Sequence, residues 1–353
     1  MSKKFLSSIK DIIRDAKKGK MFILVDDKNR ENEGDLVIPG SKCNPKKINF
    51  MAKNGRGLIC LALTPHKVKK LALPLMSLIN KSRTQTAFTV SIEAKKGITT
   101  GISAKDRAKT IKVAINNNST KKDIVSPGHV FPLVAKQGGV LERAGHTEAS
   151  VDISKLAKLN SSAVICEVMN EDGTMARYKD LVLFAKKHKL KIAKIEDLIS
   201  HRLKTERLIR LISNQKINIK NFGNFDLKTF RNTINNAEHY AIVKGKFNHT
   251  KASRVRVLSI NLLNSFFNFS DNLVKNSLKH LSKFNNFALI LIKGQNTKIQ
   301  SFESTNVLRY YGIGAQIIKE LKIKKMILVS RSKKRIIALK GYGIKISKQE
   351  IIK

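Results

Sequence analysis

An acidic loop between two short apolar runs constrains the fold of this chain most. The runs are Met-Phe-Ile-Leu-Val at 21–25 and Leu-Val-Ile-Pro at 36–39, and each is typical of a buried strand. The loop at 26–35 carries five carboxylates and one arginine, although the formal net charge of the whole chain is +43. Clustered carboxylates raise one another's pKa unless a cation offsets the repulsion. The loop therefore predicts a divalent metal with a phosphorylated or polyhydroxylated ligand, or else a solvated acidic turn.

Length and composition point to a soluble globular protein. A chain of 353 residues is expected to form one to three domains, and a hydrophobic content of 42% is ordinary for this class. No apolar run approaches the roughly 18–20 residues that span a bilayer. The first ten residues lack the apolar centre of a signal peptide. We therefore expect a cytoplasmic protein with no membrane partner.

The basic excess does not by itself indicate nucleic-acid binding. It is spread over both halves of the chain, Lys outnumbers Arg, and there is no Trp with which bases could stack. Weak, non-specific adhesion is expected rather than specific recognition. Cys43, Cys60 and Cys166 form no CxxC pair, so neither a disulfide framework nor a zinc knuckle is indicated.

Periodicity predicts an α+β N-terminal domain, with a mixed sheet and helices packed around it, followed by a smaller α/β domain. Near residue 204 acidic residues become rare, so we place the domains at 1–204 and 205–353. Helices are expected over 5–18, from 45, over 106–114, over 180–189 and over 195–202. Strands are expected at 58–63, 87–92, 163–169 and 191–195.

Two histidines accompany the acidic loop. His129 and His146 fall in glycine-flanked segments that we interpret as turns, where the backbone can approach a ligand. A lone histidine is most often structural, but an arginine and a threonine flank His146 at a predicted helix start, which favours anions. Glu31 with His146 would make a sparse site for Mg²⁺ or Mn²⁺. His129 and Glu167 could supply acid–base chemistry, although spacing alone does not show that these side chains converge.

The segment Lys-Ser-Arg-Thr-Gln-Thr at 81–86 offers hydroxyl groups and a cation. Such groups suit a phosphate or a sugar, and they suit a mobile surface loop equally well. Both interpretations stay open at this point.

Six motifs follow one another along residues 1–202. They are the acidic loop at 26–36, Thr-Ala-Phe-Thr-Val-Ser-Ile at 86–92, Ser-Ala-Lys-Asp-Arg at 103–107, Pro-Gly-His-Val-Phe-Pro-Leu at 127–133, Arg-Ala-Gly-His-Thr-Glu-Ala at 143–149, and 166–177. In this order they closely resemble the 3,4-dihydroxy-2-butanone 4-phosphate synthase family of riboflavin biosynthesis. The resemblance implies a metal-dependent carbon–carbon lyase that converts D-ribulose 5-phosphate to L-3,4-dihydroxy-2-butanone 4-phosphate and formate, through an enediolate held on Mg²⁺. It also implies a homodimer with its sites at the subunit interface.

The resemblance assigns roles to individual residues. Glu31 and His146 would be the ligands of Mg²⁺ or Mn²⁺, and His129 and Glu167 would be essential to the chemistry. A divalent ion next to two sugar oxygens stabilises an enediolate, and the later steps need several proton donors and acceptors. The residues implied to hold substrate are Arg30, Glu31, Asp35, Arg143, Ala144, Gly145, His146, Thr147 and Glu167.

The second half resembles GTP cyclohydrolase II at 238–245, 309–317 and 339–343. That family holds zinc with three cysteines, whereas this chain has no cysteine after Cys166, and the first zinc-ligand position falls at Asn261. Without thiolates a tetrahedral zinc site is implausible, so no zinc is expected. The Gly- and Arg-rich segment expected after Gly294-Gln295 is absent, an acidic position reads Val307 although Arg309 remains, and an Asn-Asn-Pro-Arg-Lys-like stretch appears as 331–335.

We therefore expect the second half to be a folded but inactive cyclohydrolase-like domain. The apolar run at 287–292 retains the pattern of a core strand. Two alternatives remain: a bifunctional enzyme that keeps GTP cyclohydrolase II activity with a different zinc arrangement, and a basic binding module.

Overall fold

The chain forms two compact units, Met1–Ile199 and Ser200–Lys353. The computed structural model describes residues 5–28, 30–77, 79–80, 84, 86–247, 251–260, 273–293, 304–332 and 344–352, with the backbone alone for 304–311. Within this part of the chain, no helix is both long and apolar enough to cross a membrane.

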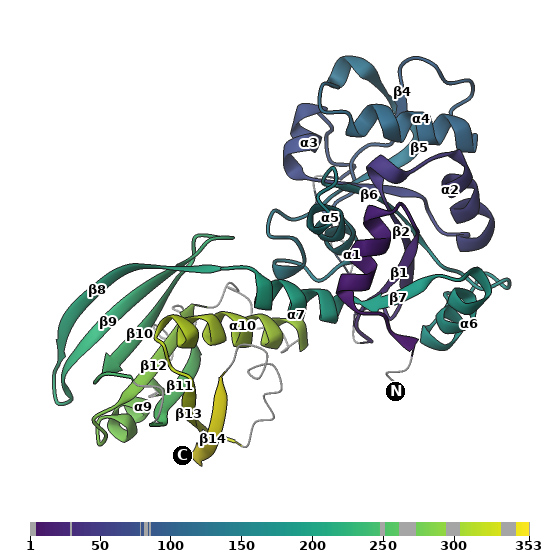
Figure 1. Ribbon diagram of the computed structural model, residues 1–353. Coiled ribbons are helices and arrows are strands. Elements are labelled where there is room, and N and C mark those ends of the chain that lie inside the picture. The colour runs from purple at the N-terminus through teal and green to yellow at the C-terminus, as the bar shows by residue number, and fades with distance from the viewer. Residues whose placement is uncertain are drawn as a thin grey trace. The chain divides into compact units, whose positions relative to one another are not determined.

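The first unit is built on a seven-stranded mixed sheet in the order β4-β5-β3-β6-β2-β1-β7 (Figure 1). The β1/β7 and β3/β5 pairs are parallel, and the other neighbours are antiparallel. The strands are β1 (Phe22–Val25), β2 (Gly34–Pro39), β3 (Cys60–Leu63), β4 (Ile92–Ala94), β5 (Ile124–Val134), β6 (Ser162–Glu167) and β7 (Lys191–Lys194).

Helices cover both faces of this sheet, which confirms the predicted fold class. The helices are α1 (Ile9–Lys17), α2 (Pro45–Phe50), α3 (Pro65–Lys70), α4 (Ala104–Ile115), α5 (His146–Leu156), α6 (Tyr178–His188) and α7 (Ile195–Thr205). Leu36 of β2 faces the main core, which includes Ile48 of α2 and Ile111 of α4. On the opposite face, Val151 of α5 packs against Ala62 of β3. Since side chains alternate along a strand, Asp35 of β2 faces the α5 side.

The second unit has its own seven-stranded sheet in the order β14-β13-β11-β12-β10-β9-β8. Strands β14, β13, β11 and β12 are mutually parallel, whereas β10, β9 and β8 continue the sheet in antiparallel fashion. Its elements are β8 (Ile209–Ile219), β9 (Gly223–Asn232), β10 (Glu238–Lys244), β11 (Ser253–Ile260), α9 (Leu273–Leu281), β12 (Phe287–Lys293), α10 (Ser304–Glu320), β13 (Lys325–Ser330) and β14 (Lys345–Ile351). The run at 287–292 is a buried core strand, as its pattern predicted.

The predicted strand at 87–92 was wrong in extent. Only Ile92 belongs to β4, and Phe88 and Thr89 make isolated bridges instead. The segment bonds to two neighbours: the Thr89 N–H donates to the Pro132 carbonyl at 3.0 Å, and the Val90 N–H donates to the Pro74 carbonyl at 3.1 Å. Each neighbour pairs with the segment at a single bridge, Leu133 with Phe88 and Leu75 with Thr89, so neither pairing extends into a ladder.

The predicted turn around His129 was also wrong, because residues 126–129 lie inside β5. The register of β5 against β4 shifts between Ile92 and Glu93, as in a β-bulge. A Cβ on Gly128 would lie 2.2 Å from the carbonyl carbon of Ile92, so this glycine allows two strands to approach closely. In the sequence, Gly128 resembles a turn residue, because a tight turn and a close approach of two strands both favour a residue without a side chain.

Candidate active site

The polar residues of the first unit gather at one end of its sheet. Asp35, the second residue of β2, lies opposite Glu167, the last residue of β6, and also opposite Leu24 of β1. The acidic loop begins directly after Val25, the last residue of β1, and so lies at the same end of the sheet. Because Leu36 faces the main core, Asp35 and Glu167 face the side covered by α5, whose first residue is His146.

The acidic loop is organised by Asp26, whose side chain is buried. Its Oδ1 accepts the Glu33 N–H at 2.9 Å, and its Oδ2 accepts the Glu31 N–H at 3.1 Å. Arg30 Nη1 donates to the same Oδ2 at 2.9 Å and also contacts the Glu31 carboxylate. Burial opposes the charge on Arg30, but Glu31 and Asp26 outweigh it and raise the pKa of the guanidinium. The loop is therefore a defined structure and not a solvated turn.

Arg177, which precedes α6, holds the loop from outside. Its Nη1 donates to the carbonyl oxygens of Glu31 and Asn32, each at 2.8 Å. Asn32 has a left-handed backbone with φ of 55°, which costs energy for a residue with a side chain. The guanidinium fixes the two carbonyls on either side of this strained position, and so it fixes where Glu31 projects.

His146 approaches the loop from the first turn of α5. Its ring is buried, and within the described part of the chain Nε2 has no hydrogen-bond partner. Nδ1 lies 3.8 Å from Oε2 of Glu31 and 3.7 Å from Oδ1 of Asp35. Burial lowers the pKa of the imidazole, so the neutral form that binds metals is favoured.

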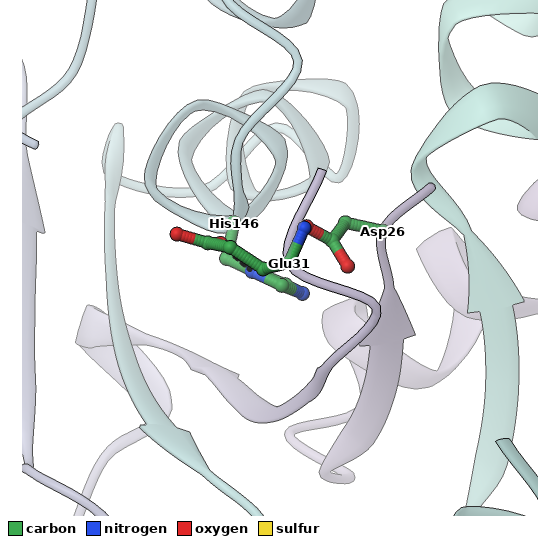
Figure 2. A group of neighbouring side chains, drawn as sticks. All are labelled: Asp26, Glu31 and His146. Atoms are coloured by element: carbon green, nitrogen blue, oxygen red, sulfur yellow. Dashed lines mark hydrogen bonds and ion pairs between the residues drawn. The ribbon is translucent and has the colours of Figure 1, made fainter. Parts of the chain in front are cut away.

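These side chains fit a divalent cation. Asp26, Glu31 and His146 lie close together (Figure 2). One ligand atom from each can be chosen so that all lie within 4.8 Å of one another. Asp26 is the most engaged of the three, since its Oδ2 accepts two hydrogen bonds and its Oδ1 accepts one, so Glu31 and His146 are the better candidates for metal ligands. In octahedral coordination at about 2.1 Å, two ligand atoms are about 3.0 or about 4.2 Å apart. The 3.8 Å separation of Glu31 and His146 lies between these two values, so a small shift of either side chain would bring both to one ion.

The carboxyl groups of Asp35 and Glu167 favour their protonated forms. Burial, reinforced by Glu167 and Glu31, raises the pKa of Asp35 well above its ordinary value. Burial likewise raises the pKa of Glu167, although the Leu58 N–H donates to its Oε2 at 2.8 Å. A Cβ on Gly57 would lie 2.5 Å from this same oxygen, so the glycine leaves room for the carboxyl group. Two carboxyl groups whose pKa values are raised in this way are suited to act as acids and as bases.

Arg143 points to a neighbouring loop rather than to the acidic one. Its Nη1 donates to Glu148 at 2.7 Å, and its Nη2 donates to the Thr84 carbonyl at 3.0 Å and the Thr86 hydroxyl at 2.8 Å. A Cβ on Gly145 would lie 2.4 Å from Arg143 Nη1, so this glycine is required by the arginine's position. Residues 81–83 and 85, to which we attributed possible phosphate binding, lie outside the described residues.

His129 projects from β5 with its side chain about half exposed, and its Nδ1 contacts the Glu93 carboxylate of β4. Its neighbour Val130 belongs to the main core, so His129 points to the opposite face, where α5 lies. The register places His129 two residues before Phe131, at the level of Leu58 and hence of Glu167. The described hydrogen bonds and ion pairs do not link His129 directly with Glu31 or His146.

Sequence reasoning missed three residues that shape the site. Asp26 was counted only as one of five carboxylates, Arg177 only as the end of a motif, and Glu93 not at all. The signal for Asp26 was its place directly after a strand, where a carboxylate often accepts backbone N–H groups of a turn. No sequence signal marks Glu93, because its partner is 36 residues away.

The sequence differences from GTP cyclohydrolase II fall mostly outside what the structure describes. Asn261, 294–295, 333–335 and 339–343 lie outside the described residues, and so do the side chains of Val307 and Arg309. What the structure adds is a well-packed core, in which Ala288, Ile290 and Ile292 of β12 are fully buried.

Comparisons with known proteins agree over the whole chain. Residues 10–201 match the family model of 3,4-dihydroxy-2-butanone 4-phosphate synthase, and residues 210–351 match that of GTP cyclohydrolase II. The chain is 44% identical to a 3,4-dihydroxy-2-butanone 4-phosphate synthase of Photobacterium phosphoreum, covering 97% of this chain and 98% of that protein. It is 42% identical to the riboflavin biosynthesis protein RibBA of Aquifex aeolicus, covering 98% and 92%.

Two solved structures are also similar. RibBX, a two-domain 3,4-dihydroxy-2-butanone 4-phosphate synthase from A. baumannii, has a TM-score of 0.86 at 39% identity and covers 98% of this chain and 100% of its own. A 3,4-dihydroxy-2-butanone 4-phosphate synthase in complex with two magnesium ions has a TM-score of 0.54 at 39% identity. It covers 57% of this chain and 98% of its own.

Proposed function

This chain belongs to the 3,4-dihydroxy-2-butanone 4-phosphate synthase family of riboflavin biosynthesis, and we propose that its first unit converts D-ribulose 5-phosphate to L-3,4-dihydroxy-2-butanone 4-phosphate and formate. The observation that carries the proposal is the pair formed by Glu31 and His146, two buried or half-buried donors 3.8 Å apart. Bound between them, Mg²⁺ or Mn²⁺ would polarise adjacent oxygens of the sugar as a Lewis acid. Oxygen and imidazole donors suit either ion, and we propose no zinc at this site.

The protein's own groups hold the protons and the substrate. Burial raises the pKa of Asp35 and of Glu167, which suits both carboxyl groups to donate protons to the substrate and to accept them from it. His129 lies at the same end of the sheet and can exchange a further proton. The N-terminus of α5, with the amides after Gly145 and the Thr147 hydroxyl, favours the phosphate. Arg30 and Arg143 contribute positive charge at the edges of the site.

The test of this function is formate release from ribulose 5-phosphate with Mg²⁺. Wild type should release formate, and Glu31→Gln should lose at least a hundredfold in rate, because the amide removes a negative ligand while keeping the size of the side chain. Glu171→Gln makes the same chemical change at an exposed surface pair and should be fully active. Absence of formate from folded wild type would overturn the proposal.

We also propose that the second unit has lost GTP cyclohydrolase II chemistry. No cysteine follows Cys166, so the three thiolates that the family uses for zinc are missing from the sequence. The alternative, a bifunctional enzyme, draws support from the family match at 210–351 and from relatives named RibBA. A basic binding module is a second alternative, which steep salt-dependent retention on nucleic acid would support.

A homodimer with sites at the subunit interface completes the proposal. Its support on the surface is a group of exposed apolar side chains in the segment that precedes Thr84, namely Leu75, Met76 and Ile79, of which Ile79 is 72% exposed. The double variant Met76→Glu and Ile79→Glu should shift the protein to monomers in analytical ultracentrifugation. A dimer that survives both charges would place the interface elsewhere.

A further inference from the structure

Three motifs of the first unit meet around a carboxylate to which the proposed function gives no role. Glu93 of β4 lies between the segment 99–106 and the bulge of β5, and its side chain is only 16% exposed. It contacts Nδ1 of His129, the residue proposed to exchange protons with substrate.

The position of Glu93 is fixed on its own strand. The preceding residue, Ile92, is fully buried in the main core. The following residue, Ala94, donates its N–H to Thr110 of α4 at 3.0 Å. Glu93 therefore cannot shift along β4 without disturbing the core on one side and the helix on the other.

The carboxyl group itself is enclosed by two glycines. Gly101 has a φ of +86°, and a Cβ there would lie 1.7 Å from Oε1 of Glu93. A Cβ on Gly128 would lie 2.4 Å from Cγ of Glu93. Both neighbours thus have to lack a side chain for the carboxylate to lie where it does.

The segment around Gly101 is held in turn by Asp106. Oδ2 of Asp106 accepts the Thr99 hydroxyl at 2.7 Å and the Gly101 N–H at 3.2 Å, while the Asp106 N–H donates to Ser103 at 3.0 Å. The Ser103–Arg107 motif thus supports the site indirectly. Through Asp106 it holds Gly101 against Glu93, and Glu93 in turn contacts His129.

From this chain of contacts we infer that Glu93 is a positioning residue for His129. It holds the imidazole with its proton on Nδ1, so that Nε2 carries the lone pair and faces the site. When Nε2 takes a proton from the substrate, the imidazolium that forms is stabilised by the adjacent carboxylate, and Nε2 later returns the same proton. An oriented base with a carboxylate behind it is the arrangement that fixes tautomer and direction in catalytic histidines.

The inference rests on the proposed function, because it gives His129 a partner for that reaction. Glu93→Gln should lower kcat ten- to a hundredfold and leave KM within twofold, since the amide removes the charge that favours the imidazolium but touches no substrate. Glu93→Asp, which keeps the charge, should recover part of kcat. Glu171→Gln is the matched control.

A spectroscopic readout keeps the test independent of turnover. In protein labelled with ¹⁵N-histidine, the signals of His129 are identified by their loss in His129→Gln. They should show the Nδ1–H tautomer in wild type and a mixture of tautomers in Glu93→Ala. The tautomer is readable even if a variant has lost all activity.

The outcomes separate the two proposals. If wild type releases formate but Glu93→Gln keeps wild-type kcat and Glu93→Ala keeps the Nδ1–H tautomer, the role of Glu93 is overturned and the function stands. If wild type releases no formate, the proposed function fails, and the tautomer comparison alone supports or overturns the control of His129 by Glu93.

Discussion

Asp35 on β2 lies directly opposite Glu167 on β6, and both carboxyl groups are withdrawn from water. Burial makes it costly for either carboxyl group to carry a charge, and more costly for both to do so, because like charges at paired positions repel. Ionising these groups in the absence of metal therefore carries an electrostatic cost, which a cation held by Glu31 and His146 would relieve.

Asp35→Asn should stabilise the metal-free protein at alkaline pH. Because its pKa is raised in the folded state, Asp35 binds its proton more tightly there than in the unfolded chain. Its favourable contribution is full below the unfolded pKa and is lost as pH rises through the folded pKa. Asn has no proton to lose, so its advantage should grow as the pH rises above the unfolded pKa of about 4 and through the raised folded pKa of Asp35. We expect this as a higher Tm of Asp35→Asn than of wild type at alkaline pH, with a gap that closes in acid.

Calorimetry of wild type and Asp35→Asn in the presence of a chelator checks this expectation. Glu171→Gln, at a site 86% exposed, provides the control and should follow wild type throughout. A gap between Asp35→Asn and wild type that stays constant with pH would contradict the raised pKa.

Arg177→Met should weaken metal binding although Arg177 is no metal ligand. The loss of two hydrogen bonds to the carbonyls of Glu31 and Asn32 frees the strained turn, so Glu31 is no longer pre-oriented. Removal of such supporting contacts typically costs ten- to a hundredfold in affinity. Electron paramagnetic resonance of Mn²⁺ titrations should show a dissociation constant about tenfold higher.

Arg56→Met is the control for this experiment. Arg56 also bonds a backbone carbonyl and a carboxylate, those of Met169 and Glu171, outside the acidic loop. Unchanged Mn²⁺ affinity in Arg177→Met, or an equal loss in both variants, would argue against a specific hold on the loop.

The purified full-length chain should contain no stoichiometric zinc and should not turn over GTP. The physical reason is the absence of thiolate ligands after Cys166, since oxygen and nitrogen donors alone do not reproduce the family's three-cysteine site. Elemental analysis and a GTP assay, run beside a cyclohydrolase II that has the cysteines, check both points. One zinc per chain together with GTP hydrolysis would establish the bifunctional alternative.

The second unit should lose stability in mild acid through His239. This histidine is 2% exposed, its Nδ1 accepts the Lys293 N–H at 3.2 Å, and burial lowers its pKa to about 4. The unfolded chain binds the proton at about pH 6.5, so stability is present above that pH and is lost as pH falls towards 4. The full loss is about 3 kcal/mol.

His239→Asn isolates this effect, because an amide oxygen can still accept the Lys293 N–H but does not titrate. The variant should be less stable than wild type at pH 7.5, and the difference should shrink by pH 4.5. Hydrogen exchange of β10 peptides, corrected for the intrinsic pH dependence, measures it within the full chain. A difference that is the same at both pH values would rule out His239 as the source.

The sequence by itself determined most of the architecture and half of the site. Apolar runs and helix periodicity are local signals, so they located the strands and helices around the acidic loop and predicted the mixed sheet with its helices. The motif order indicated the family, and the missing thiolates could be read directly from the residues. Glu31 and His146 were selected by residue type, by the residues that flank His146 and by the family resemblance.

The tertiary structure alone decided how segments that are distant in the chain lie against one another. Residues 126–129, predicted as a turn, belong to β5 because β4 approaches Gly128 closely and the register shifts there. No local sequence pattern encodes that approach. The same holds for two further contacts of the site. Arg177 donates a hydrogen bond to the Glu31 carbonyl, and the Glu93 carboxylate contacts the His129 ring. A hydrogen bond between side chain and backbone leaves no periodic trace in the sequence. Only the folded sheet, which sets the registers of its strands, brings these partners within reach.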